Sequence, residues 1–238
     1  MLCHGWPEHA FSWRHQMPAL AAAGYHVIAP NQRGYGTSSR PAEVTDYDIE
    51  HLSGDLVALL DHYGYEDATF VGHDWGAFVV WGLTLLHPDR VNKVINLSLP
   101  YQERGEKPWI ESMEDTLGGD FYFVHFNRQP GVADAVFEDN TFQFLRNLYR
   151  KNEPSREPRP GMALIDLARA ETPLGDPVMS DGDRDVIARS ENLTAFVPNV
   201  EVVGLDCGHW IQQERPEETN QSILKWLEQR NAVQACPR

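Results

Sequence analysis

The sequence predicts an α/β fold, a mostly parallel sheet with helices on both of its faces. Short β-branched runs alternate with runs whose apolar residues recur at helical spacing, and this alternation is typical of a parallel sheet. The length agrees with it, because 238 residues are enough to bury one core of ordinary size. We therefore expect one sheet domain rather than several.

The first hundred residues supply most of this alternation. The run YHVIAP (residues 25–30) is β-branched and ends at a proline, so it predicts a buried strand. Asp46 or Asp48 can begin a helix that continues to about Tyr63, because apolar residues recur there at helical spacing. The other expected elements are a strand over 68–71, a helix over 76–86 and a strand over 91–97.

The pattern changes near Pro100. The following stretch is rich in Pro, Gly, Arg and Glu and contains amphipathic segments such as residues 132–149, which predicts a helical insertion or lid. The run VEVVGL (residues 200–205) predicts a return to the sheet, and residues 217–230 predict a terminal helix. The expected domains are the sheet core over 1–99 and 182–238 and the lid over 100–181.

Composition excludes several classes of protein. The net charge is −15 and no run of Lys or Arg occurs, so binding to nucleic acid or to an anionic membrane surface is not expected. No apolar stretch approaches the roughly 18 residues of a membrane helix, and no signal peptide is visible. The cysteines are scattered and the histidines lack metal-ligand spacing. We expect a cytoplasmic protein without a metal or cofactor.

The segment FVGHDWGA (residues 70–77) carries the most specific chemical signal. It has the frame of the Gly-x-Ser-x-Gly nucleophile elbow, with Asp74 in place of the serine. Gly72 and Gly76 would allow the tight turn and the close packing of helix on strand that an elbow requires. Taken alone, the segment is equally compatible with Asp74 as an N-cap of an ordinary helix.

Two further segments favour the elbow. His4-Gly5-Trp6-Pro7 matches the loop that contributes a backbone N–H to an oxyanion hole. Near the other end, His209 follows the expected strand over 200–205, and Asp185 lies between the two segments. The order of Asp74, Asp185 and His209 is nucleophile, acid and histidine, as in hydrolases built on such a sheet.

With these motifs the chain resembles the α/β-hydrolase-fold epoxide hydrolases, the soluble type with an aspartate nucleophile. The matching segments are HGWPE (4–8), RGYGTSS (33–39), GHDWGA (72–77), QPGVAD (129–134) and CGHWIQQERPEE (207–218). The resemblance implies the α/β-hydrolase fold and the conversion of a small apolar epoxide and water to a vicinal diol. The sequence leaves monomer and homodimer open.

The chemistry explains a carboxylate at the elbow. An ionised Asp74 can open an epoxide by displacement without a base, and the product is an ester of Asp74. His209, oriented by Asp185, can then activate water, while the backbone N–H groups of Trp6 and Trp75 hold the oxyanion.

The resemblance also implies two lid tyrosines that hydrogen-bond the epoxide oxygen. Tyr122 is the candidate for the first, with lid packing as its alternative role, and the family motif of the second is not found. Trp75, Trp109 and Phe126 are candidates for the lining of the substrate pocket, although Trp109 and Phe126 could equally form the core of the lid.

Two places depart from the family pattern. Met1 runs almost directly into the His-Gly motif, without the strands that should precede it. Around residues 181–182 no apolar segment is long enough to form the strand that should carry the acid Asp185. We therefore expect a chain that is shortened at both places, with weak or no turnover if the printed sequence is complete.

Two alternatives remain at this point. A haloalkane dehalogenase shares the aspartate nucleophile and the following tryptophan, but those enzymes commonly carry Asn where this chain has Trp6. A non-catalytic binding protein of the same fold is favoured by the missing segments and disfavoured by the intact pair of Asp74 and His209.

Overall fold

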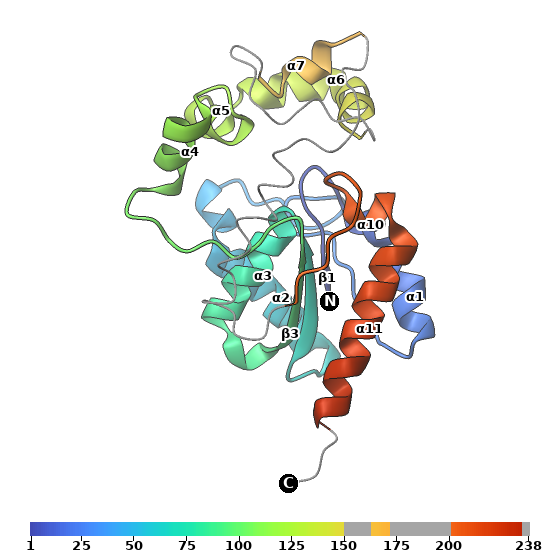
Figure 1. The fold of residues 1–238 in the computed structure, drawn as a ribbon. Helices are drawn as coiled ribbons and strands as arrows, with labels where there is room; N and C mark the ends of the chain where they lie inside the picture. Colours follow the sequence, from blue (N-terminus) through green and yellow to red (C-terminus); the bar gives the residue numbers. More distant parts are fainter. Residues whose placement is uncertain (150–162, 172–200, 235–238) are drawn as a thin grey trace. The chain divides into compact units, whose positions relative to one another are not determined.

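A three-stranded parallel sheet organises the first part of the chain (Figure 1). The structure, a computed structural model, describes residues 1–149, 163–171 and 201–234. The strands lie in the order β1 (Leu2–Cys3), β2 (Ala68–His73) and β3 (Val91–Leu97). Cys3, the last residue of β1, pairs with Gly72, so β1 and β2 end within one residue of each other. The residues that follow these two strands therefore meet at one edge of the sheet.

Helices cover both faces of this sheet, as the sequence predicts. On one face, Phe70 of β2 packs with Leu56 and Leu60 of α2 and with Val80 of α3. On the other face, Val71 packs in a cluster with side chains of α1 and α11. The bounds of these helices are Gln16–Ala22 for α1, Ile49–Tyr63 for α2, Trp75–Leu86 for α3 and Pro216–Gln234 for α11. Shorter helical segments are η1 (Ala10–Trp13), η2 (Val44–Tyr47), η3 (Pro88–Arg90) and α10 (Ile211–Glu214).

The start of α2 shows how local chemistry sets the position of an element. Of the two candidate starting residues, Asp48 is the N-cap, and its carboxylate accepts a hydrogen bond from the backbone N–H of His51. The helix ends at Gly64, whose φ of 75° is in the left-handed region that favours glycine. The structure thus selects Asp48 over Asp46 as the start and places the end of the helix at Tyr63, where the sequence predicts it.

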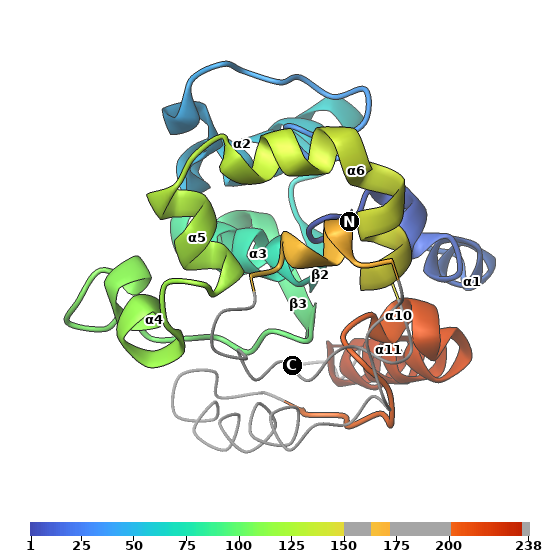
Figure 2. The same cartoon turned by 90° about the horizontal axis from the view of Figure 1, so that it is seen from above.

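The described chain divides into two compact units, one with the sheet and one that begins at Gln102. The second unit is a helical insertion after β3, as predicted, with α4 (Trp109–Leu117), α5 (Tyr122–Arg128), α6 (Val132–Leu148) and α7 (Asp166–Arg169). Helix α6 bends at Asn140 and lies beside α7 (Figure 2). Asn147 of α6 holds the pair together, because its Nδ2 donates to the carbonyls of Leu167 and Ala170 over 2.8 and 2.9 Å.

Two predicted strands are not formed in the described residues. Residues 25–30 make one backbone hydrogen bond to the sheet, from Leu2 N–H to the carbonyl of Ile28, and β1 beside them is too short to extend a ladder. Residues 201–205 are also outside the sheet, and Val202 and Val203 are each more than half exposed. A β-branched run becomes a strand only where a neighbouring strand pairs with it.

Candidate active site

Asp74 lies at a strained turn between β2 and α3. Its φ of 52° and ψ of −122° are unusual for a residue other than glycine. The turn brings backbones together so closely that a methyl group on Gly76 would overlap the carbonyl of Cys3. Asp74 occupies the N-cap position of α3, but its side chain makes no capping hydrogen bond to the helix, so the carboxylate does not serve as a cap. The geometry is that of a nucleophile elbow.

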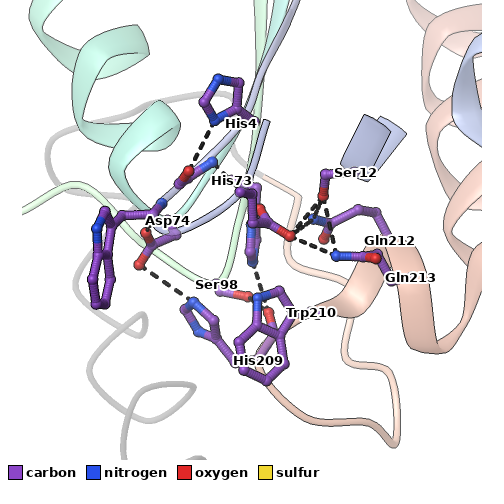
Figure 3. Close-up of polar contacts among 12 residues, drawn as sticks. His4, Ser12, His73, Asp74, Ser98, His209, Trp210, Gln212 and Gln213 are labelled. Carbon is purple, nitrogen blue, oxygen red and sulfur yellow. Dashed lines mark hydrogen bonds and ion pairs between the residues drawn. The ribbon is translucent and has the colours of Figure 1, made fainter. Parts of the chain in front are cut away.

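The Asp74 carboxylate contacts residues from both ends of the chain (Figure 3). One oxygen, Oδ1, accepts a hydrogen bond of 2.9 Å from the backbone N–H of Trp6, in the loop after β1. The other oxygen, Oδ2, lies 3.3 Å from Nε2 of His209. A carboxylate, a backbone donor and an imidazole therefore converge at the edge of the sheet where the sequence places them.

These contacts keep Asp74 ionised. Burial alone would raise the pKa of its carboxyl group by disfavouring the charged form. The hydrogen bond and charge of His209, the charge of His73 and the N–H of Trp6 outweigh burial and hold the pKa of Asp74 well below its usual value of 3.8. At neutral pH the residue is a carboxylate that can act as a nucleophile without a base.

His209 is held through its backbone as well as through its ring. Its carbonyl oxygen accepts a hydrogen bond of 2.8 Å from Nε2 of His73 and another of 2.8 Å from Oγ of Ser98 (Figure 3). The rings of His209 and His73 also lie close, with centroids 4.8 Å apart. No specific signal in the sequence marks Ser98 or His73 as part of the site.

A buried carboxylate lies behind His73. Glu8 Oε2 is 2.8 Å from Nδ1 of His73, while Glu8 Oε1 accepts hydrogen bonds from Ser12 Oγ and Gln213 Nε2, both at 2.6 Å. Burial raises the pKa of Glu8 and lowers that of His73. Their mutual hydrogen bond and opposite charges outweigh burial, so the pKa of Glu8 is lowered and that of His73 is raised, which favours an ion pair.

The comparisons with known proteins agree with this geometry. Residues 1–157 match the family described as the alpha/beta hydrolase fold. Epoxide hydrolase A of Mycobacterium tuberculosis (strain ATCC 25618 / H37Rv) is 34% identical over 287 residues, covering 95% of this chain and 89% of that protein. The chain belongs to the epoxide hydrolases of the α/β-hydrolase fold.

A solved structure and a longer protein, both named epoxide hydrolases, are also similar to this epoxide hydrolase. The structure titled epoxide hydrolase from an endophytic Streptomyces superposes with a TM-score of 0.77 at 31% identity, covering 97% of this chain and 89% of that chain. Bifunctional epoxide hydrolase 2 of Sus scrofa is 30% identical over 283 residues. That alignment covers 95% of this chain but 51% of the pig protein, so this epoxide hydrolase spans about half of it.

The alignment with the M. tuberculosis protein is longer than this chain, as expected for a shortened chain. The match to the M. tuberculosis protein runs over 287 positions, whereas this epoxide hydrolase has 238 residues. The alignment therefore contains positions at which the relative has a residue and this chain has none. This agrees with the prediction that residues present in the relative have no counterpart here.

The remaining predicted residues are divided between the two units of the chain. Trp75 begins α3 and its ring lies 5.3 Å from that of Phe78. Tyr122, Trp109 and Phe126 belong to the helical unit, where aromatic rings form a continuous cluster: the centroids of Tyr122 and Phe126 are 5.7 Å apart. Asp185 lies outside the described residues. Its role and the roles of the lid residues remain predictions.

Two general expectations concern metals and membranes. Over residues 1–149, 163–171 and 201–234, no three His, Cys, Asp or Glu side chains are grouped so that they could hold a metal ion. Within the same ranges, no helix combines the length and the apolar character needed to cross a membrane.

Proposed function

We propose that this epoxide hydrolase converts an epoxide to a vicinal diol through a covalent ester of Asp74. The observation that carries the proposal is the position of the Asp74 carboxylate, on a strained elbow, between the N–H of Trp6 and the imidazole of His209. The same three groups suit both halves of a two-step hydrolysis.

In the first step, an oxygen of Asp74 forms a bond to one ring carbon while the bond from that carbon to the epoxide oxygen breaks. The lowered pKa of Asp74 ensures that the nucleophile is ionised. The alkoxide oxygen, which stays attached to the other ring carbon, must take up a proton. Tyr122 is our candidate for the donor and would become a phenolate. The product is a hydroxyalkyl ester of Asp74.

In the second step, His209 takes a proton from water and the resulting hydroxide attacks the ester carbonyl of Asp74. The negative charge of the tetrahedral intermediate develops on an oxygen of Asp74, where the N–H of Trp6 already donates. Trp75 N–H is the proposed second donor, and Asp185 the proposed acid that orients His209. Collapse breaks the ester bond and the released diol oxygen takes the proton held by His209. The proton left on the Asp74 carboxyl group returns to the Tyr122 phenolate through solvent, so that the carboxylate and the phenol are both restored.

The proposal is tested by trapping the ester. His209→Gln retains the nucleophile but lacks the base, so incubation with a small aryl epoxide should add one whole epoxide mass to the intact protein. The adduct should be absent in a variant that also carries Asp74→Asn. A protein alkylated by a chloroalkane but by no epoxide would instead be a dehalogenase, and alkylation by neither would favour a binding protein.

A further inference from the structure

The backbone carbonyl of His209 is held by donors from two adjacent strands. His73 is the last residue of β2 and Ser98 is the first residue after β3. Each donates to the His209 carbonyl oxygen over 2.8 Å. The sheet therefore fixes the main chain of the residue whose ring faces Asp74, independently of any contact that the ring itself makes.

Ser98 has an unusual backbone conformation. Its φ of 62° is in the left-handed region, and among the described residues Asp74 is the one other non-glycine residue with a positive φ. Strained backbone persists where the surrounding structure requires it, and such positions cluster at functional sites. At Asp74 the strain presents the nucleophile. At Ser98 it accompanies a hydroxyl group that donates to the catalytic histidine.

His73 is equipped to be a strong donor. A carbonyl oxygen can only accept, so Nε2 of His73 must carry the hydrogen that bonds to His209. Its Nδ1 faces the buried Glu8 carboxylate, whose other oxygen is occupied by Ser12 and Gln213. With a proton on both nitrogens, the ring donates a charge-assisted hydrogen bond, which is stronger than a neutral one.

We propose that Ser98 and His73 form a carbonyl clamp that positions His209 for the hydrolysis of the Asp74 ester. This inference rests on the proposed function and assigns positioning residues to its second step. The imidazole must hold a water molecule against the ester carbonyl, and small displacements of such a group reduce rates strongly. The clamp acts on His209 from the sheet side, within residues that the structure describes.

The clamp predicts a defect confined to one step. In Ser98→Ala, single-turnover measurements of intact-protein mass should show ester formation within about twofold of wild type and ester hydrolysis slowed about tenfold. The ester should therefore accumulate during steady-state turnover of this variant. A loss of folded enzyme alone would lower the amount of ester formed, but it would not slow ester hydrolysis selectively.

Two further variants separate positioning from folding. Ser98→Gly also removes the hydroxyl group but adopts a positive φ without strain, so it should hydrolyse the ester as slowly as Ser98→Ala with no lower thermal stability. Ser53→Ala is the matched control, because its buried hydroxyl group donates to the carbonyl of Ile49 within α2. It should leave both steps unchanged.

The outcomes are distinguishable. Ester hydrolysis at the wild-type rate in both Ser98 variants would overturn the clamp and leave the proposed function intact. Equal slowing of formation and hydrolysis would also overturn it. If His209→Gln forms no ester with any epoxide, the proposed function fails, and the clamp fails with it.

Discussion

Glu8 and His73 form a buried pair, with Oε2 and Nδ1 2.8 Å apart and side chains that are 1% and 0% exposed. The pair connects the loop after β1 with the last residue of β2. Since two charges buried in this way are stable only together, removing one of them leaves the other without compensation. The pair therefore links the stability of the fold to the geometry behind Asp74.

Glu8→Gln should lower the free energy of unfolding by about 3 kcal/mol where the ion pair is fully formed. Because the pKa of Glu8 is lowered in the folded state, its carboxylate stabilises the fold at pH values above its ordinary pKa of 4.5. Because the pKa of His73 is raised, its imidazolium stabilises the fold at pH values below its ordinary pKa of 6.5. The loss should therefore be greatest between pH 4.5 and 6.5, and it should shrink as the pH rises through the raised pKa of His73.

Urea unfolding at several pH values measures this difference. Glu66→Gln, on an exposed residue, is the control and should change stability by less than about 0.5 kcal/mol. A destabilisation of Glu8→Gln that is the same at acid and alkaline pH would show that His73 is not charged in the folded protein.

Asp74 should remain ionised far into the acid range. Because its pKa is lowered, its contribution to stability is present above the ordinary value of 3.8 and is lost only as the pH falls through the lower value in the folded state. The carboxyl carbon resonance of Asp74, assigned by its absence in Asp74→Asn, should show no titration between pH 7 and the ordinary value of 3.8. A midpoint at or above that value would contradict the ion contacts seen here.

Elements of the fold and the site can be predicted from the sequence where local signals agree with the final packing. Helix α2 has a regular apolar stripe that predicts the helix and its end near Tyr63, while its start was narrowed to Asp46 or Asp48. Asp74 and His209 could be paired from the order of their motifs along the chain, and their side chains do lie together, although the strand expected before His209 is not formed. Neither inference needed a contact between distant side chains to be known in advance.

Other features have no local signature. The pairing of Glu8 with His73 joins residues 65 positions apart, and a buried polar pair leaves no periodic pattern. The positive φ of Ser98 follows a strand without a glycine to mark it. The runs at 25–30 and 201–205 have strand composition, but pairing requires a neighbour that composition cannot supply. For Glu8 and His73, the one clue in the sequence was that they lie within the motifs at 4–8 and 72–77 that match the family.

The elbow should tolerate no side chain at Gly76. In Gly76→Ala the added methyl group would overlap the backbone carbonyl of Cys3, which cannot move without displacing β1 from β2. We expect the free energy of unfolding to fall by about 3 kcal/mol or more. Gly54→Ala, within α2, is the control: no atom lies within 4 Å of the added methyl group, so stability should rise by about 0.5–1 kcal/mol. Equal stabilities in a urea titration would contradict the close approach at the elbow.

Tyr122 should contribute to ester formation if it donates a proton to the epoxide oxygen. Tyr122→Phe removes the hydroxyl group but keeps the ring that contacts Phe126, so the aromatic cluster should survive. We expect the rate of ester formation to fall about tenfold or more, because general acids contribute about 10²–10⁴ in such reactions, while ester hydrolysis stays unchanged. Tyr149→Phe, at the end of α6, is the control and should leave both rates unaltered. Unchanged ester formation in Tyr122→Phe would show that Tyr122 serves only to pack the helical unit.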